Sequence, residues 1–221
     1  HYKVIRYDVR RHGRTRSPGG EYSDSEDLYR LLKHLGVDKA YVVGLSLGGR
    51  IAIDFALEHP DMISALVPVA PGLSGYQFTW QGIRDNSKEF FQALERRDVE
   101  RATEYLLRCW TDGPRRTPDQ VDPAVRKRVR GMLTENLTRP MSEEELSPQV
   151  PAAINRLKEI RAPTLIIVGD LDAPDIASIV DKLVSEIDGA KKVVIPGVGH
   201  MVNMERPDEF NRALLDFLSR Q

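Results

Sequence analysis

A serine, two aspartates and a histidine each lie within a few residues of the end of an apolar run. They are Ser46, Asp170, Asp172 and His200. A serine hydroxyl is a poor nucleophile until a base accepts its proton, and imidazole has a suitable pKa near neutral pH. A carboxylate beside the imidazole fixes its tautomer and stabilises its charged form. These residue types therefore predict nucleophilic catalysis by Ser46, with His200 as the base.

The segment around Ser46 has the pattern Gly-x-Ser-x-Gly between two regular elements. The apolar, β-branched run at 41–43 predicts a buried strand, and apolar residues at helical spacing in 50–59 predict a helix. A turn this tight between a strand and a helix crowds the backbone. Small residues at Gly44 and Gly48 are explained by that crowding.

Such a turn is a nucleophile elbow. It would hold the Ser46 hydroxyl above the end of the strand and present the Leu47 N–H, at the helix N-terminus, to a developing oxyanion. Because glycine and serine are common residues, the alternative is a simple strand–helix turn without chemistry.

The elements that must position these residues alternate along the chain. The other expected strands lie at 2–7, 63–70, 162–169 and 191–196, and the other expected helices lie at 23–35, at 176–187 and after Pro207. This alternation predicts the α/β class, with a mostly parallel, doubly wound sheet covered on both faces. In such sheets catalytic groups gather at the carboxyl ends of the strands, where Ser46, the aspartates and His200 are expected.

The alternation of strand and helix stops near Gly75 and resumes near residue 158. Between these points apolar residues recur at helical spacing, and Gly-Pro, Thr-Pro, Asp-Pro and Arg-Pro pairs mark the joints. We therefore expect a core made of residues 1–74 and 158–221, with a helical insertion at 75–157.

Composition excludes several partners. The chain of 221 residues carries 32 Lys and Arg and 33 Asp and Glu, which argues against nucleic acid as a partner held by net charge. No apolar run approaches the length of a membrane span, so no membrane partner is expected. The single cysteine, Cys109, cannot form an internal disulfide, and we expect a buried thiol in a cytoplasmic protein. A homo-oligomer is compatible with this composition.

The acidic partner of His200 is open on spacing alone. Asp170, Asp172 and Asp175 all follow the same predicted strand, and Asp175 could instead cap the following helix.

Four stretches together resemble the α/β-hydrolase superfamily, specifically its small lidded group of esterases, enol-lactonases, cofactor-free haloperoxidases and C–C hydrolases. They are residues 4–10, 43–49, 168–172 and 196–201, the last followed by Glu-Arg-Pro at 205–207 and Phe-Asn at 210–211. The chain order serine, aspartate, histidine is also that family's order. The resemblance implies that Asp172, the second aspartate of a Gly-Asp-x-Asp motif, is the catalytic acid and that Asp170 is structural. It implies no metal and no organic cofactor.

The insertion corresponds, by this resemblance, to the family's helical cap, which shapes the pocket for an acyl group or ring. The candidate pocket residues are Trp80, Phe78, Trp110 and Met201. The alternative for each of them is a place in the core of the cap.

The chain departs from the family pattern in two places. The loop after the first expected strand usually reads Asp-x-Arg-Gly-x-Gly-x-Ser, and here Arg11 stands at the first of those glycines. The family's first three strands precede the segment where this chain begins, and one of them ordinarily lies between the strand at 2–7 and the strand before Ser46. Its loop supplies a second oxyanion donor. Because unpaired strand edges are costly, we expect either a fragment of a longer protein or direct pairing of these two strands.

We expect a serine hydrolase that cleaves an ester or lactone of a small molecule through an acyl-enzyme. Ser46 would attack, His200 would move the proton, Asp172 would orient His200, and the Leu47 N–H would hold the oxyanion. Serine at the elbow argues against the family's dehalogenase and epoxide-hydrolase branches, which use aspartate there. The alternatives are a C–C hydrolase, a peptidase or a perhydrolase of the same fold, or a non-catalytic protein that binds a small ligand.

Overall fold

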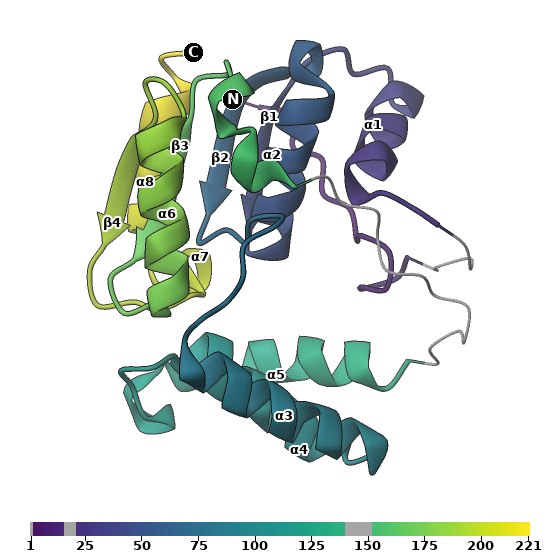
Figure 1. The fold of residues 1–221 in the computed structure, drawn as a ribbon, viewed down its shortest axis with the longest axis vertical. Helices are drawn as coiled ribbons and strands as arrows, with labels where there is room; N and C mark the ends of the chain where they lie inside the picture. Colours follow the sequence, from purple (N-terminus) through teal and green to yellow (C-terminus); the bar gives the residue numbers. More distant parts are fainter. Residues whose placement is uncertain (1, 16–20, 140–151) are drawn as a thin grey trace.

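A parallel sheet of four strands forms the centre of the computed structural model, which describes residues 2–15, 21–139 and 152–221 (Figure 1). In sheet order the strands are β1 (Ala40–Leu45), β2 (Ile63–Val69), β3 (Leu165–Gly169) and β4 (Lys191–Ile195). β3 is buried along its whole length, which suits the near-continuous apolar sequence of an inner parallel strand. The expected α/β class and parallel sheet are confirmed.

The register of the strands brings their carboxyl ends to one edge of the sheet. Val43 of β1 lies opposite Val67 of β2, and Ile167 of β3 lies opposite both Val69 of β2 and Val193 of β4. Because all three pairings are parallel, the loops that leave β1, β3 and β4 emerge at the same edge of the sheet.

Helices cover both faces of the sheet (Figure 1). One face carries α1 (Asp24–His34), α2 (Leu47–Glu58) and α6 (Pro174–Glu186), and the other carries α7 (Val202–Glu205) and α8 (Pro207–Leu218). Neighbouring residues of β3 divide between the two layers, since Ile166 packs in the cluster with Phe55 whereas Ile167 packs in the cluster with Leu218. This is the alternation that a strand buried on both faces requires.

The helix boundaries follow local capping chemistry. The Ser23 hydroxyl accepts a bond from the Glu26 N–H at the start of α1, and Gly36 follows its end with a φ of 67°. Short 3-10 turns lie at Pro60–Met62, Pro118–Gln120, Ala153–Asn155 and Leu157–Glu159. Within the described ranges, no helix combines the length and the apolar character needed to cross a membrane.

The insertion forms a helical layer of its own, toward which the arrowheads of β2 and β4 point (Figure 1). It contains α3 (Gln81–Glu95), α4 (Val99–Leu106), a π-helical turn η2 (Leu107–Asp112) and α5 (Pro123–Leu137). The carboxyl edge of the sheet therefore faces the insertion.

The strand expected at 2–7 is absent, and that prediction is wrong. These residues have no regular structure and are exposed, although the Tyr2 ring meets the Tyr41 ring of β1 edge-on at 5.8 Å between centroids. A strand forms only where its backbone groups find a neighbouring strand, and within the described residues β1 pairs with β2 alone. The expected direct pairing of 2–7 with β1 is therefore also wrong.

Candidate active site

Ser46 alone makes the turn between β1, which ends at Leu45, and α2, which begins at Leu47. Its φ of 56° and ψ of −112° lie in a region that residues with a Cβ rarely adopt. The Ser46 N–H donates to the Val69 carbonyl at 2.9 Å, and its own carbonyl accepts from the Gly72 N–H at 3.1 Å. The end of β2 and the loop after it thus hold the strained residue in place.

The glycines around Ser46 are required to different degrees. A Cβ on Gly44 would lie 2.1 Å from the Gly48 carbonyl oxygen, and a Cβ on Gly49 would lie 2.7 Å from the Pro71 Cβ. A Cβ on Gly48 would meet nothing within 4 Å. The steric interpretation therefore holds for Gly44 but is wrong for Gly48, because only the backbone of Gly48 takes part in the crowding. The second glycine that sterics demand is Gly49.

His200 and Asp172 form a buried pair. The His200 Nδ1 lies 2.9 Å from Asp172 Oδ2 and 3.2 Å from Oδ1, and the two residues are 2% and 7% exposed. Asp172 Oδ1 also accepts a bond from the Ala173 N–H at 2.7 Å. The carboxylate is fixed from two sides, so it sets the orientation and the tautomer of the imidazole.

The Nε2 atom of His200 is the unused side of the imidazole. It is buried and has no hydrogen-bond partner among the described residues, Ser46 included. A buried nitrogen without a partner is uncommon in folded proteins and calls for an explanation. The bond between a nucleophile and its base is often long without substrate and shortens in the complex. Nε2 is thus the atom available to accept a proton.

The structure separates the three candidate acids that spacing left open. Asp172 contacts His200, whereas Asp170 is exposed and accepts a bond from the Gly197 N–H at 2.7 Å. Asp170 therefore braces the loop that leads to His200. Asp175 lies in the first turn of α6 but is not its N-cap, which is Ala173.

Asp175 binds the start of the insertion instead. Its carboxylate accepts bonds from the Trp80 N–H at 2.8 Å, the Thr79 N–H at 3.1 Å, the Thr79 hydroxyl at 2.9 Å and the Tyr76 hydroxyl at 3.1 Å. Burial alone would raise the pKa of Asp175, but these four donors outweigh burial and lower it. We call residues 76–80 the strap.

Aromatic rings extend from the strap to the catalytic histidine candidate. The Phe78 ring meets the Trp110 ring edge-on at 6.2 Å between centroids, and the Trp110 ring lies 4.8 Å from that of His200. Of the four predicted pocket residues, Trp110 thus contacts His200, and Phe78 contacts Trp110.

The other two pocket candidates lie differently. Met201 packs against the small apolar cluster of the insertion, which contains Leu107, Val125 and Val129. The Trp80 ring lies against Gly82 at the start of α3, since a Cβ on that glycine would come within 2.2 Å of it. Both residues are partly buried, and Trp80, like Phe78 and Trp110, packs against the main apolar cluster.

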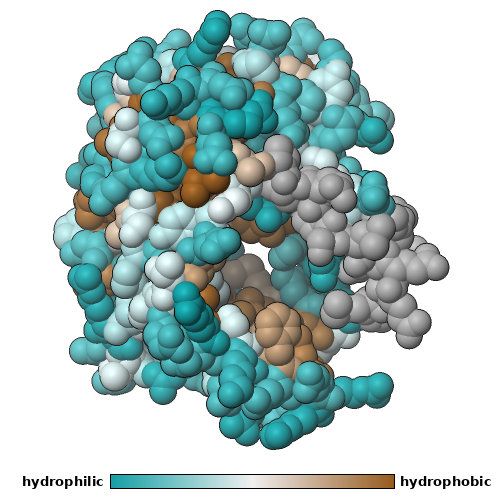
Figure 2. Space-filling view, in the orientation of Figure 1, coloured by the Kyte–Doolittle hydropathy of each residue, from teal (hydrophilic) through white to brown (hydrophobic). Residues whose placement is uncertain are grey.

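Space remains between the sheet layer and the insertion. Figure 2 shows the molecule hollowed between its upper part and the helices below, with apolar surface at the margin of the hollow. The carboxyl edge of the sheet faces the same side, so a small molecule could reach the strand ends from here.

Cys109 lies close to the pair but is not a reactive group. It is 5% exposed, and burial raises the pKa of its thiol to about 12, with the nearby charge of Asp172 acting in the same direction. The expected burial of Cys109 is confirmed.

The loop after residues 2–7 adopts the conformation that glycine favours, although Arg11 occupies the position. The φ of Arg11 is 68°. A Cβ on Gly13, two residues further on, would lie 2.1 Å from the Asp8 carboxyl carbon. Arg11, which stands where the family pattern has glycine, thus keeps the conformation of the turn but strains the backbone.

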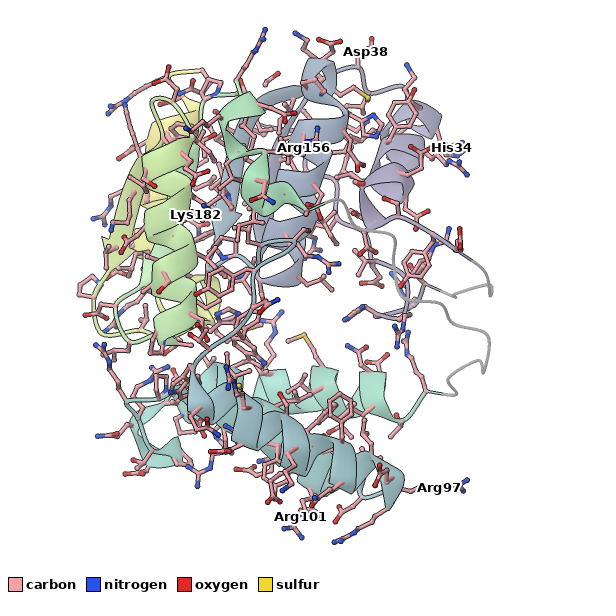
Figure 3. All side chains as sticks on the ribbon, viewed as in Figure 1. His34, Asp38, Arg97, Arg101, Arg156 and Lys182 are labelled. Atoms are coloured by element: carbon pink, nitrogen blue, oxygen red, sulfur yellow. The ribbon has the colours of Figure 1, made fainter. Side chains whose placement is uncertain are left out.

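Two other described histidines, His34 and His59, lie in different settings. Figure 3 shows His34 projecting from α1 into solvent. His59 stacks on Tyr29 at 4.3 Å between ring centroids. Within the described residues, no group of three or more His, Cys, Asp or Glu side chains could hold a metal ion.

A buried ion pair between Arg116 of the insertion and Glu205 of α7 was not predicted. Glu205 also accepts a bond from the Gly199 N–H, next to His200, at 3.1 Å. The partners lie far apart in the sequence, and each resembles an ordinary surface charge. A signal that points to Glu205 is its place in the Glu-Arg-Pro stretch after His200.

Comparison with known proteins agrees with this geometry. Residues 1–207 match the model of the family described as the alpha/beta hydrolase fold. A curated relative, the 2-hydroxy-6-oxo-6-phenylhexa-2,4-dienoate hydrolase of Comamonas testosteroni, is 28% identical over 205 residues, which are 86% of this chain. The match spans 66% of that relative's own length, somewhat less than two thirds.

Solved structures show the same likeness. A hydrolase from Pseudomonas aeruginosa PA01 is 29% identical with a TM-score of 0.76, covering 99% of this chain and 80% of its own. Est816, described as an N-acyl homoserine lactone degrading enzyme, is 26% identical with a TM-score of 0.68, covering 95% and 80%. The family match covers nearly the whole chain, and the protein is therefore a member of the α/β-hydrolase family.

Proposed function

We propose that the chain is a serine hydrolase that cleaves an ester or lactone through an acyl-enzyme. The observation that carries this proposal is the buried pair of His200 and Asp172, 2.9 Å apart, at the same sheet edge as the strained Ser46 turn. A strained nucleophile turn and a fixed imidazole with a free Nε2 are what serine catalysis requires.

The reaction proceeds in two halves. The Ser46 hydroxyl attacks the carbonyl carbon while His200 Nε2 accepts its proton, and the imidazolium is stabilised by Asp172. The oxyanion accepts a bond from the Leu47 N–H, which has no partner within α2 because it is the first residue of that helix. His200 then gives the proton to the leaving alkoxide. In the second half His200 activates a water that attacks the acyl-enzyme, and Ser46 is restored.

The insertion at 75–157 acts in this proposal as a cap. Phe78 and Trp110 form an apolar wall beside His200, which suits an apolar acyl group or ring. Met201 packs against the cap from outside it, and Trp80 packs against the apolar core of the sheet layer. The lone, buried Cys109 thiol supports a cytoplasmic setting.

A second candidate is a C–C hydrolase, because the curated relative from Comamonas testosteroni is named for a dienoate substrate. A carboxylate on the substrate would need a positive charge near the site. Arg50 in the first turn of α2 already pairs with Asp24 at 2.8 Å, and Arg116 of the insertion pairs with Glu205. The Arg116 guanidinium is thus engaged on both terminal nitrogens, whereas Arg50 Nε has no hydrogen-bond partner among the described residues.

The test is a comparison of two substrates on one preparation. A short-chain aryl ester and 2-hydroxy-6-oxo-6-phenylhexa-2,4-dienoate are assayed with the wild-type chain and with Ser46→Ala. We expect turnover of the ester that falls at least about 10³-fold in Ser46→Ala. Faster turnover of the dienoate would favour the second candidate. Turnover of neither substrate, with a ligand bound in the hollow, would instead support a non-catalytic binding protein.

A further inference from the structure

The pair of Arg116 and Glu205 joins the insertion to the elements around His200. Arg116 Nη2 lies 3.2 Å from Glu205 Oε1, its Nη1 bonds to Oε2, and both side chains are 6% exposed. Two nitrogens that face two carboxylate oxygens form the bidentate arrangement, which fixes geometry as well as charge. Burying both charges is costly, so the pair is weak evidence for a role in stability alone.

Hydrogen bonds continue from both partners into the backbone. Arg116 donates to the Thr111 carbonyl at 2.8 Å, at the end of η2. Glu205 Oε1 accepts from the Gly199 N–H at 3.1 Å, and Gly199 immediately precedes His200. A continuous series of bonds therefore runs from the insertion to the Gly199 N–H, in the residue before the catalytic base.

Gly199 packs against the Arg116 guanidinium without room for a side chain. A Cβ at this position would be 2.3 Å from Arg116 Nη2. The neighbouring Trp110, two residues before the end of η2, packs on the His200 ring at 4.8 Å. The same segment of the insertion thus contacts both the ring of His200 and the peptide before it.

We propose that Arg116 and Glu205 are positioning residues that hold the Val198–Gly199 peptide, and through Gly199 the adjoining His200 and its Nε2, where Nε2 can take the Ser46 proton. This inference rests on the proposed serine hydrolase. Neither residue touches the reacting atoms. The insertion then has two tasks, since it walls the substrate site and also places the base.

The test uses Glu205→Gln, which keeps the shape of the side chain, and the milder Arg116→Lys. Misplacing a catalytic group by about 1 Å can cost about 100-fold in rate. We expect fluorophosphonate labelling of Ser46, and kcat for the aryl ester, to fall about 10- to 100-fold, with little change in KM. We also expect the far-downfield proton signal of His200 Nδ1–H, bonded to Asp172, to shift or broaden.

Arg126→Lys is the matched control. Arg126 is 14% exposed and bonds to Asp112 at 2.9 Å within the same insertion, and its ion-pair partners, Asp112 and Glu104, both belong to the insertion. We expect its labelling rate to stay within about twofold of wild type, since its bonds do not reach His200. Far-UV circular dichroism confirms that each variant is folded.

Three results would overturn the proposal. The melting temperatures of Glu205→Gln and Arg116→Lys could fall while Ser46 is still labelled at the wild-type rate. That result would make the pair purely structural. Arg126→Lys could lose as much activity, which would indicate general loosening. If wild-type Ser46 takes no label, the proposed function fails. The positioning role of Arg116 and Glu205 is then judged from the Nδ1–H signal of His200 alone. A changed signal in Glu205→Gln then supports positioning, and an unchanged one refutes it.

Discussion

The sheet core and the insertion are held together by different forces. In the core, apolar side chains such as Phe55 and Ile167 are fully buried on either face of the sheet, and the register places the strand ends. The insertion has a small apolar cluster and relies on charge. Arg126 bonds to Asp112 at 2.9 Å and to Glu104 at 2.6 Å, and these hydrogen bonds, led by the one to Asp112, raise the pKa of Arg126.

The candidate site is divided between residues positioned by the sheet core and a residue whose loop is held by the insertion. The serine sits at a turn that the end of β2 and the following loop hold in place, and the carboxylate sits on the loop after β3, held by the Ala173 N–H and His200. The histidine sits on a loop that the insertion braces. Charged residues at the outer end of the insertion, such as Arg97 and Arg101, point away from the site (Figure 3). Substitutions in the core should therefore cause large losses of catalytic rate or of folding free energy. Substitutions in the insertion should cause smaller, partial losses.

The largest effect is expected for Asp172→Asn. Loss of the carboxylate that orients an imidazole lowers kcat by about 10⁴-fold in serine hydrolases. Asp170→Asn is the control on the same loop, because Asp170 bonds to Gly197 and not to His200. Initial rates with the aryl ester measure both. Equal losses in the two variants would remove the distinction drawn here between the two aspartates.

Gly44→Ala tests the steric basis of the elbow. Its Cβ would lie 2.1 Å from the Gly48 carbonyl oxygen, so we expect a loss of about 3 kcal/mol or more in the free energy of unfolding. Gly48→Ala meets nothing within 4 Å and lies in α2, where alanine is the better helix former. We expect it to unfold at the same or a higher urea concentration. A destabilised Gly48→Ala would contradict the packing described here.

Asp54 gives the core a pH-dependent element. Burial raises the pKa of this carboxyl to about 6, and the Ser74 hydroxyl, 2.7 Å away, offsets burial only in part. The folded state therefore holds the proton more tightly than the unfolded chain, and the contribution of Asp54 to stability falls as pH rises from about 4 to about 6. At about 1.4 kcal/mol per pKa unit, the ionised form costs the folded state up to roughly 3 kcal/mol.

Asp54→Asn isolates this contribution. We expect the difference in unfolding free energy between the variant and the wild type to move in favour of the variant between pH 4 and pH 6 and to stay level above that range. Urea denaturation at a series of pH values measures it. A difference that does not vary with pH would show that Asp54 keeps an ordinary pKa.

The smallest effect is expected at the strap. Asp175→Asn weakens the acceptor for Tyr76, Thr79 and Trp80, and we expect a loss of about 1–2 kcal/mol. Amide hydrogen exchange at Thr79 and Trp80 should accelerate. Asp181→Asn, on the exposed side of α6, is the control. If the strap amides stay protected in Asp175→Asn, the carboxylate does not hold the start of the insertion.

The parts of the fold that the sequence predicted are those with a local signal. The apolar run before Ser46 indicates a strand within a few residues, and the segment 23–35 indicates a helix in the same local way. The run at 2–7 has the same local signal but no neighbouring strand, and strand formation depends on that neighbour.

The site residues, too, divide into those with a local sequence signal and those without one. Ser46 and His200 were identified from their places after strands, but spacing could not choose between Asp170, Asp172 and Asp175, because the choice depends on how the loop folds. For the pair of Arg116 and Glu205, the Glu-Arg-Pro stretch points to Glu205 alone, and nothing local points to Arg116 or to the pairing. Ion pairs between distant segments depend on tertiary packing, which a single sequence does not display.

The central claim is that Ser46 is activated by the buried pair of His200 and Asp172. Labelling with a fluorophosphonate probe, followed by mass spectrometry of the peptides, tests it most directly. We predict a single adduct on Ser46 in the wild type that is lost in His200→Ala. No adduct on the folded wild-type chain, or one that persists unchanged in His200→Ala, would contradict the account.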